Sequence, residues 1–449
     1  MNVAIIGTGY VGLTTGACLA FLGHDVTCVD VAEQKIAALE RGEVPIYEPH
    51  LAELIAGARA HLRFTTDYSQ AIPNAQVVFI AVGTPSSGTG APNLSYLEAA
   101  ARAIGEYLAQ PYTVVVNKST VPIGSGNWVG SLVREAVADR AHCRFAVASN
   151  PEFLREGTAI FDSLYADRVV IGTDEEHAAE VLYTLYRPVL EQTFQAPSYL
   201  PRPEDLGAVP LISTDLASAE LIKYSANAFL ALKISFINEI GGLAEKVGAD
   251  IMQVAKGMGL DARIGTRFLQ AGIGWGGSCF GKDTAALVST AAEYGLDMPI
   301  VKAAREMNRR QRERIVEKLL HELKILKGRT VGLLGLAFKP HTDDLREAPA
   351  IEIARKLIER GVRVRVHDPV AMDRFRLEHS DLDVTCCESA SDVARDADAL
   401  VLVTEWPEYR DLDWEALLPS MRSPIVLDGR NAFDKARMTR AGYRYLSLA

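Results

Sequence analysis

The sequence predicts an α/β protein built from two doubly wound domains that a long central helix joins. Strand patterns alternate with helical patterns in both halves of the chain, which favours parallel sheets covered by helices. An apolar, β-branched run enters a glycine turn twice, before Gly7 and before Gly335. Between the halves, apolar residues recur every three or four positions over Asp215–Val247, as they do along a helix. Both halves are therefore predicted to be Rossmann-like domains.

Length and composition limit the possible functions. A chain of 449 residues is too long for one ordinary core and predicts two or three domains. Its net charge of −10 argues against nucleic acid as a partner. No apolar run reaches membrane-spanning length, and the chain enters a strand at once, without a signal peptide. The six cysteines are scattered without metal-ligand spacing, so we expect no metal and a reducing cytoplasm.

The first glycine turn has the spacing of a dinucleotide-binding site. The strand pattern Asn2–Ile6 leads into Gly7, Gly9 and Gly12, and a helical pattern follows over Leu13–Leu22. In this motif the first glycine makes the tight turn, the second admits a pyrophosphate, and the third lets the helix pack on the strand. The N-terminus of the helix then favours the anionic pyrophosphate.

An acidic residue after the second strand indicates which cofactor binds. The strand pattern Asp25–Val29 ends at Asp30, where a carboxylate accepts a hydrogen bond from the 2′-hydroxyl of a ribose. A 2′-phosphate would be repelled by that carboxylate. The sequence therefore predicts NAD rather than NADP.

The later strands of the first domain end at polar motifs. The patterns predict strands over Val77–Val82, Thr113–Asn117, Phe145–Ala148 and Val169–Gly172, and a helix over Tyr96–Leu108. Gly83–Thr84, Lys118–Thr120 and Asn150–Glu152 follow three of these strands. Ligands of doubly wound sheets bind beyond the carboxyl ends of the strands, so we expect a ligand site at these motifs.

A proline-rich segment and a long helix come next. Ala196–Ser213 shows little pattern and is interpreted as a linker, and the helix Asp215–Val247 is broken only by Gly241–Gly242. We expect this helix to form the interface of a homodimer. Lys223 and Asn227 lie one helical turn apart, so both project from one face. Lys223 is either a solvated surface charge or, because its neighbours are apolar, a buried functional one.

The second domain repeats the opening pattern with one change. The patterns predict a strand over Thr330–Gly335, a helix over Ala350–Arg360, and further strands over 362–367, 384–385, 399–404 and 424–428. Gly332 and Gly335 are present, but the helix start lacks a third glycine and Phe338–Asp344 is inserted instead. This difference argues against a second NAD and for another nucleotide.

A cysteine lies in a glycine-rich stretch, Gly272–Asp283. Lys282 and Asp283 follow Cys279 closely, so the thiol has a cation that favours the thiolate and a carboxylate that is a candidate base. Glycine also lets a ligand approach the backbone. Cys279 is therefore a candidate nucleophile, and the alternative is a buried, inert cysteine in a glycine-rich turn.

Short motifs follow one another in a fixed order along the whole chain. They are Gly7–Gly12, Pro45–Pro49, Lys118–Pro122, Asn150–Gly157, Lys223–Phe229, Phe268–Gly272, Gly276–Phe280, Phe338–Lys339 and Asp428–Asn431. Together they resemble the UDP-glucose/GDP-mannose dehydrogenase family. The resemblance implies an NAD-binding Rossmann domain at 1–200, a central helical dimerisation domain with catalytic residues at 213–320, and a UDP-sugar-binding Rossmann-like domain at 325–449.

The resemblance also implies a reaction. It implies a four-electron oxidation of a sugar C6 alcohol to a carboxylate, with NAD as cofactor and UDP-glucose as substrate. An aldehyde needs an added nucleophile before it can lose a second hydride, and Cys279 is implied to supply it through a thiohemiacetal and a thioester. The other implied catalytic residues stabilise the oxyanion or act on water and protons: Lys223, Asn227, Asp283, Glu152 and Thr120.

Binding roles are implied by the same motifs. The implied NAD contacts are Gly7, Gly9, Val11, Gly12, Asp30, Lys35, Thr84, Thr120, Glu152, Lys282 and Arg346. The implied substrate contacts are Glu152, Phe153, Leu154, Arg155, Lys223, Asn227, Arg263, Phe268, Leu269, Gln270, Ala271, Gly272, Gly276, Phe338, Lys339 and Arg430. Arg263 is implied to reach the substrate of a partner subunit.

The chain departs from the family pattern in places, and other functions remain. Gly281 stands where proline is usual, and Trp275 where Phe or Tyr is usual. A GDP-mannose 6-dehydrogenase with the same chemistry is the nearest alternative. A one-step hydroxyacid dehydrogenase would not need Cys279, and an NAD-sensing regulator would need a basic nucleic-acid-binding module, which the sequence lacks.

Overall fold

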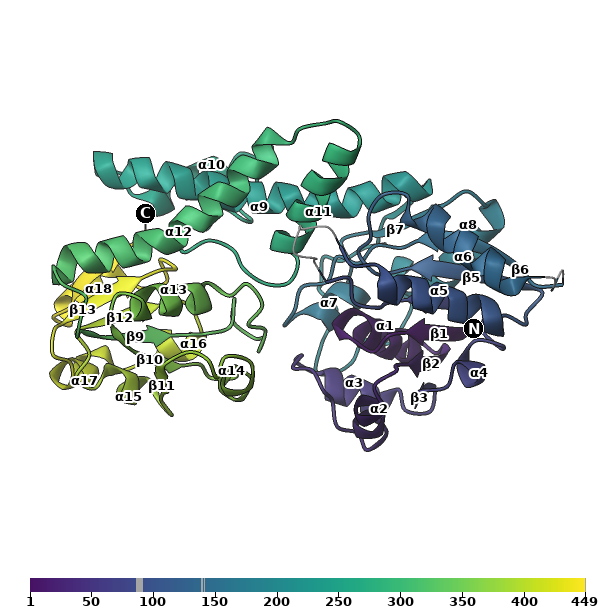
Figure 1. Cartoon of the computed structure of the whole chain (residues 1–449), viewed down its shortest axis with the longest axis horizontal. Helices are drawn as coiled ribbons and strands as arrows, with labels where there is room; N and C mark the ends of the chain where they lie inside the picture. The colour runs from purple at the N-terminus through teal and green to yellow at the C-terminus, as the bar shows by residue number, and fades with distance from the viewer. Residues whose placement is uncertain (86–91, 139, 141, 449) are drawn as a thin grey trace. The chain divides into compact units, whose positions relative to one another are not determined.

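A computed structural model describes the chain except for residues 86–91, 139, 141 and 449 (Figure 1). The chain forms two compact units. The first contains Met1–Ala226 and Ala285–Tyr294, and the second contains Asn227–Thr284 and Gly295–Ala449. Each unit is built around one sheet, so the predicted pair of Rossmann-like domains is confirmed.

In the described part of the first unit, the sheet has eight strands in the order β3-β2-β1-β4-β5-β6-β7-β8. Its first six strands follow the Rossmann order 3-2-1-4-5-6. The order reverses between β1 and β4, so the carboxyl ends of these two strands mark the place where such sheets bind a dinucleotide. The strands are β1 (Asn2–Ile6), β2 (Asp25–Val29), β3 (Leu62–Thr65), β4 (Val77–Ile80), β5 (Tyr112–Asn117), β6 (Arg144–Ser149), β7 (Val169–Thr173) and β8 (Leu211–Thr214).

Helices cover both faces of this sheet, because alternate strand residues point to opposite sides. Along β1, Val3 and Ile5 belong to the core under α1, α2, α3, α7 and α8. Ala4 and Ile6 belong to the core under α4, α5 and α6. The helices are α1 (Tyr10–Phe21), α2 (Glu33–Glu40), α3 (Leu51–Gly57), α4 (Tyr68–Ala71), α5 (Ser95–Tyr107), α6 (Ser125–Val137), α7 (Ala159–Leu164) and α8 (Glu176–Leu190).

The far edge of the first sheet differs from the expectation of parallel strands throughout. β7 runs antiparallel to β6, and β8 pairs in parallel with β7. Only the six-residue helix α7 lies between β6 and β7, and it spans about 9 Å, too short to carry the chain back along a strand. β8 also occupies the end of Ala196–Ser213, so the prediction of a linker is wrong there: Val169–Gly172 pairs with Leu211–Thr214.

Four helices follow the first sheet: α9 (Leu216–Val247), α10 (Ile251–Gly259), α11 (Phe280–Glu293) and α12 (Pro299–Leu323). The long helix α9 is continuous through Gly241–Gly242, so the predicted break is wrong. Two glycines cost only about 2 kcal/mol of helix propensity, and packing of Ile237 and Ala244 in one core outweighs that cost. Among the described residues, no helix is long and apolar enough to cross a membrane.

Over the residues described up to 448, the sheet of the second unit has six strands in the order β11-β10-β9-β12-β13-β14, again the Rossmann order. All its neighbouring strands are parallel. Its strands are β9 (Thr330–Leu334), β10 (Arg363–His367), β11 (Val384–Cys386), β12 (Ala399–Leu402), β13 (Ile425–Asp428) and β14 (Arg444–Ser447). Its helices are α13 (Pro349–Ile358), α14 (Met372–Glu378), α15 (Ala390–Ala394), α16 (Pro407–Arg410), α17 (Trp414–Leu417) and α18 (Lys435–Arg440).

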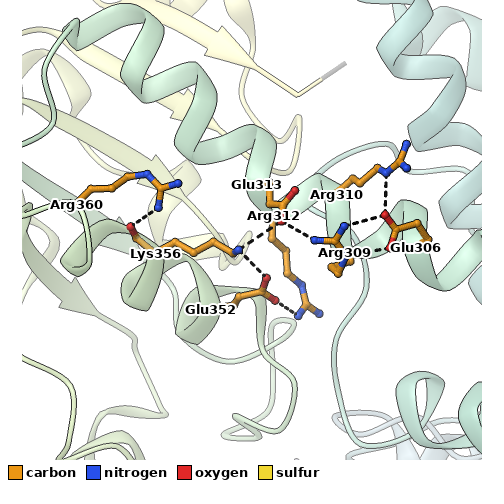
Figure 2. Close-up of polar contacts among 8 residues, drawn as sticks. All are labelled: Glu306, Arg309, Arg310, Arg312, Glu313, Glu352, Lys356 and Arg360. Carbon is orange, nitrogen blue, oxygen red and sulfur yellow. Dashed lines mark hydrogen bonds and ion pairs between the residues drawn. The ribbon is translucent and has the colours of Figure 1, made fainter.

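A chain of charges connects α12 to α13 within the second unit (Figure 2). Glu313 on α12 accepts from Arg309 at 2.6 Å and from Lys356 on α13 at 3.5 Å. Arg312 donates to Glu352 at 2.5 Å. Single exposed pairs contribute little to stability, but a network fixes the relative position of two helices better than one pair does. The residues of the network are Glu306, Arg309, Arg310, Arg312, Glu313, Glu352, Lys356 and Arg360.

Candidate functional site

The glycine turn after β1 has the shape that a dinucleotide needs. Gly7 has φ of 101°, and a Cβ on Gly12 would collide with the Gly7 carbonyl oxygen. A Cβ on Gly9, in contrast, would meet no described atom within 4 Å. Gly9 is also the N-cap of α1 and offers no side chain, so the first N–H groups of the helix are available to an anion. These residues fit the pyrophosphate of NAD.

The carboxylate predicted to select NAD lies beside this turn. Asp30 Oδ2 accepts from the backbone N–H of Thr8 at 2.9 Å, from its hydroxyl at 2.7 Å, and from Lys35 Nζ at 2.8 Å. Burial alone would raise the pKa of Asp30, but the bonds from Lys35 and Thr8 hold it at about 2. Asp30 is therefore ionised at neutral pH and placed to accept from a ribose hydroxyl.

In the second unit, the acidic residue in the position that corresponds to Asp30 is buried and hydrogen-bonded by protein groups. Asp368 follows β10, is 1% exposed, and accepts from the backbone N–H groups of Leu336 and Ala337 at 2.7 and 3.0 Å. Trp406 donates its indole N–H to the same carboxylate at 3.1 Å. Burial separates the two acids: the Asp30 side chain is 11% exposed, whereas Asp368 is not accessible to a ribose hydroxyl.

A buried ion pair joins two predicted catalytic residues in the first unit. Lys223 Nζ on α9 lies 2.8 Å from Glu152 Oε1, and the two side chains are 5% and 6% exposed. Of the two readings of Lys223, the solvated surface charge is therefore wrong. Burial alone would raise the pKa of Glu152, but the charge of Lys223 and its hydrogen bond lower it.

Other predicted residues of the first unit lie around this pair in different ways. Leu154 donates its backbone N–H to Glu152 Oε2 at 2.6 Å. The Phe153 ring packs under the Arg168 guanidinium, 3.6 Å from its centroid. Arg155 instead pairs with Asp162 of α7, and half of its side chain is exposed. Leu154 thus contacts Glu152 directly, whereas Arg155 pairs with a different residue.

Two of the residues predicted to contact NAD, Thr84 and Thr120, are joined by a hydrogen bond between their loops. Thr84 donates its hydroxyl to the carbonyl of Thr120 at 2.9 Å, so the ends of β4 and β5 are held together. Val11 on α1 is half-buried. Both threonines follow strands at the carboxyl edge of the sheet, as the sequence predicted.

The cysteine lies in the second unit, at the start of α11. Cys279 is half-buried, whereas Cys18 and Cys28 are 4% and 0% exposed in the core of the first unit. Burial raises the pKa of both core thiols to about 12. The inert, buried reading thus fits Cys18 and Cys28, and Cys279 has the access that a nucleophile needs.

An amide and a carboxylate accompany Cys279. Asp283 donates its backbone N–H to the Cys279 carbonyl at 2.8 Å, one helical turn away. Its side chain is 1% exposed and accepts from Asn227 Nδ2 at 2.6 Å. Lys282 Nζ lies 3.4 Å from the other carboxylate oxygen. The predicted residues Asn227, Lys282 and Asp283 are therefore together, and α9 presents Asn227 one turn after Lys223.

The glycine loop before Cys279 is fixed by α12. Trp275 donates its backbone N–H to Asn308 Oδ1 at 2.7 Å, and Asn308 Nδ2 donates back to the Trp275 carbonyl at 2.9 Å. The Trp275 indole donates to Ser235 at 3.2 Å. At Gly281, a Cβ would overlap the carboxylate of Glu347, so a larger residue there would require the Glu347 side chain to move. Loop and helix thus hold the cysteine turn in one position.

The remaining predicted residues of the second unit are partly engaged by other protein groups. Arg430 donates to the carbonyls of Val403, Gly274 and Phe338 at 2.7, 3.0 and 3.0 Å. Arg263 and Arg346 each pair with a nearby aspartate and are more than half exposed. Six of the rest stand in the chain shortly before Cys279, and Lys339 follows Phe338, whose ring lies next to Gly277: Phe268, Leu269, Gln270, Ala271, Gly272 and Gly276 are the six.

Sequence reasoning missed three buried groups that hold these residues. Lys118 lies near Glu152 and Lys223, and its charge acts on both. Glu220 accepts from the backbone N–H groups of Gly124 and Gly126 at 2.7 and 2.9 Å, at the start of α6. Glu48 accepts from Ala159 at 2.7 Å, which ties α7 to the loop before α3. Lys118 and Glu48 stood in motifs, but spacing along the chain did not indicate their partners.

Comparison with known proteins covers the whole chain. Residues 1–190 match the NAD binding domain of the UDP-glucose/GDP-mannose dehydrogenase family, residues 217–310 its central domain, and residues 332–435 its UDP binding domain. The chain is 46% identical over 452 residues to a UDP-glucose 6-dehydrogenase of Bacillus subtilis (strain 168), covering 100% of this chain and 93% of that one. It is 45% identical over 456 residues to a UDP-glucose 6-dehydrogenase of Rhizobium meliloti (strain 1021), covering 100% and 99%.

A solved structure is also similar over its full length. It is a UDP-glucose dehydrogenase from the archaeon Pyrobaculum islandicum, with a TM-score of 0.90 and 40% identity. The alignment covers 100% of this chain and 97% of that one. The fold is therefore shared along the entire chain.

Proposed function

Because this chain belongs to the UDP-glucose/GDP-mannose dehydrogenase family, with NAD as its cofactor, we propose that it oxidises C6 of UDP-glucose to give UDP-glucuronate. The observation that carries this proposal is the buried Lys223–Glu152 pair, with Asn227, which is bonded to Asp283, one turn further along α9. The names of the two bacterial relatives support UDP-glucose as the substrate.

The proposed reaction has two oxidations. When bound, NAD accepts the hydride that leaves C6 in each of them. After the first, the thiolate of Cys279 adds to the aldehyde carbon and forms a thiohemiacetal. Loss of the second hydride leaves a thioester, and water then releases the carboxylate and restores the thiol. Two NAD are reduced for each sugar oxidised.

Charged and polar side chains stabilise each step in this proposal. Lys223 and Asn227 donate to the oxygen on C6 when it carries negative charge, which stabilises the transition state more than the ground state. Glu152, kept ionised by Lys223, takes a proton from the water that attacks the thioester, and Thr120 helps to hold that water. Asp283 is the candidate base that activates Cys279. Its backbone N–H donates a hydrogen bond to the Cys279 carbonyl.

We also propose a homodimer through α9. Four of the exposed apolar side chains of the helix recur on one face: Phe229 at 61%, Phe236 at 43%, Leu243 at 61% and Val247 at 68%. A contiguous exposed apolar stripe of this kind marks an interaction surface. A second copy of the same helix covers it in a symmetric dimer. Light scattering is expected to give a dimer, and a Phe236→Glu variant is expected to be a monomer.

The substrate assignment is tested by counting NADH. Purified protein is given a known, limiting amount of UDP-glucose with excess NAD, and the absorbance of NADH is followed to its end point. Two NADH per sugar are expected. One NADH per sugar would contradict the thioester route and support a one-step dehydrogenase. A parallel assay with GDP-mannose tests the alternative substrate, and faster turnover of GDP-mannose would refute the choice of UDP-glucose.

NAD-dependent chemistry and the scattered cysteines support a cytoplasmic reaction.

A further inference from the structure

A third charge lies in the buried cluster of Glu152 and Lys223, and none of the roles above uses it. Lys118 follows β5, and 9% of the residue is exposed. Its Nζ donates to Asn150 Oδ1 at 2.8 Å and lies 3.4 Å from the hydroxyl of Tyr186. The ammonium is therefore held in one position by the protein itself.

The hydrogen bonds of Lys118 reach the segment that carries Glu152. Asn150 stands two residues before Glu152, and its Oδ1 also accepts from the Tyr186 hydroxyl at 2.5 Å. Its Nδ2 donates to the carbonyl of Val170 on β7 at 2.7 Å. The amide of Asn150 is thus anchored on both sides, and Lys118 is one of its anchors.

The hydrogen bond to Asn150 does not by itself explain why a charged side chain is buried at position 118. Burying an ammonium costs several kcal/mol, whereas a neutral side chain would serve Asn150 equally well. The cluster holds two cations, Lys118 and Lys223, against one carboxylate, Glu152. The positive charge of Lys118 lowers the pKa of Glu152, in addition to the larger effect of Lys223.

We propose that Lys118 is a positioning residue for the oxidation: its ammonium keeps Glu152 ionised while Lys223 interacts with the substrate oxygen, and its bond to Asn150 holds the Glu152 segment. This proposal rests on the proposed function, in which Glu152 acts on the hydrolytic water. Without Lys118, Glu152 would depend on Lys223 alone, and the charge of Lys223 would be shared with the oxyanion.

Four titratable groups face Lys118: Glu152, Lys223, Cys18 and Tyr186. Burial raises the pKa of Cys18 to about 12 and that of Tyr186 well above its ordinary value, so both are neutral below pH 9. Burial lowers the pKa of Lys118 to about 8, although Glu152 acts in the opposite direction. Below pH 8 Lys118 therefore keeps its positive charge, and Cys18 and Tyr186 add no charge to the cluster.

The test is the pH dependence of kcat for UDP-glucose oxidation. Lys118→Met removes the charge and the donor, and Lys118→Gln removes the charge but keeps an amide N–H for Asn150. Loss of a nearby opposite charge shifts a carboxylate pKa by about 1 unit or more. We therefore expect the acid limb of the kcat profile to move up by about one pH unit in both variants. At pH values below the acid limb, the kcat of each variant is expected to be about tenfold lower than that of the parent. At pH values above the limb, kcat is expected to stay within about threefold of the parent.

A matched variant separates charge from packing. Tyr186→Phe removes the hydroxyl that shares Asn150 Oδ1 with Lys118 but leaves the ammonium in place. Its acid limb is expected to stay where it is in the parent, and the KM for UDP-glucose is expected to change little in all three variants. If Lys118→Met does not fold, Lys118→Gln carries the test, because its amide replaces the donor to Asn150.

The outcomes distinguish this proposal from the proposed function. An acid limb that stays in place in a folded, active Lys118→Gln variant would overturn the role of Lys118 and leave the dehydrogenase reaction intact. A limb that moves equally in Tyr186→Phe would show that packing, not charge, is responsible, and would also overturn it. If the parent protein does not oxidise UDP-glucose at all, the proposed function fails first.

Discussion

Replacing Lys223 by methionine removes one charge from the buried pair and keeps most of the side-chain volume. Glu152, 6% exposed, then loses its ion-pair partner at 2.8 Å. A buried pair that loses one member costs about 3–5 kcal/mol of stability if the remaining charge stays ionised. The carboxyl can instead take up a proton, and the easier of the two routes sets the loss.

The protonation route gives a magnitude that depends on pH. The ordinary pKa of the Glu152 carboxyl is 4.5, and each pH unit above the pKa costs about 1.4 kcal/mol to keep the group protonated. At pH 7 the Lys223→Met variant should therefore lose about 3.5 kcal/mol in free energy of unfolding. The folded pKa of Glu152 is raised in the variant, so the loss shrinks as pH falls, to less than about 1 kcal/mol at pH 5.

Urea denaturation at pH 7 and pH 5 measures this loss, and steady-state kinetics measures the catalytic effect. Because the ammonium acts on charge that appears in the transition state, kcat should fall by about 10²–10³ with a smaller change in KM. Lys246→Met is the matched control, since Lys246 lies on the same helix and is exposed. A loss below about 1 kcal/mol at pH 7, or a kcat within about threefold of the parent, would refute the reasoning.

Three further predictions concern single side chains. Cys279→Ser should abolish turnover of UDP-glucose while NAD binding, measured by calorimetry, stays within about twofold, because the NAD turn lies in the other unit; normal turnover would remove Cys279 from the mechanism. Asp30→Ala should reduce the preference for NAD over NADP in kcat/KM by about tenfold or more, since the ionised carboxylate at pKa about 2 repels a 2′-phosphate; an unchanged ratio would contradict that role. Burial raises the pKa of Glu220 from 4.5 to about 7, so its contribution to stability is full below pH 4.5 and is lost as pH rises through 7. Denaturation of Glu220→Gln at pH 4.5 and pH 8 should therefore show that the parent loses about 3 kcal/mol more than the variant; parallel pH profiles would show that the bonds from Gly124 and Gly126 already keep Glu220 ionised.

Local spacing was enough to predict the dinucleotide turn. Gly7, Gly12 and Asp30 act through the backbone geometry of one strand, one helix and the next strand, so their roles depend on neighbours that the sequence itself displays. The period of the α-helix likewise places Lys223 and Asn227 on one face of α9 from their spacing alone. The structure confirms the geometry of the turn and the shared helix face because short-range geometry decides both, whereas the roles of these residues stay predictions.

Tertiary structure alone decided the partners of those side chains. Glu152 lies 71 positions before Lys223 in the chain, and only the return of α9 to the sheet brings the two together. Arg155 belongs to the same motif as Glu152, yet it pairs with Asp162 on α7. The antiparallel direction of β7 depends on the short reach of α7, which no strand pattern reveals. Charge, burial and pKa are properties of such long-range contacts, because a carboxylate or an ammonium takes its ionisation from whatever the fold places beside it.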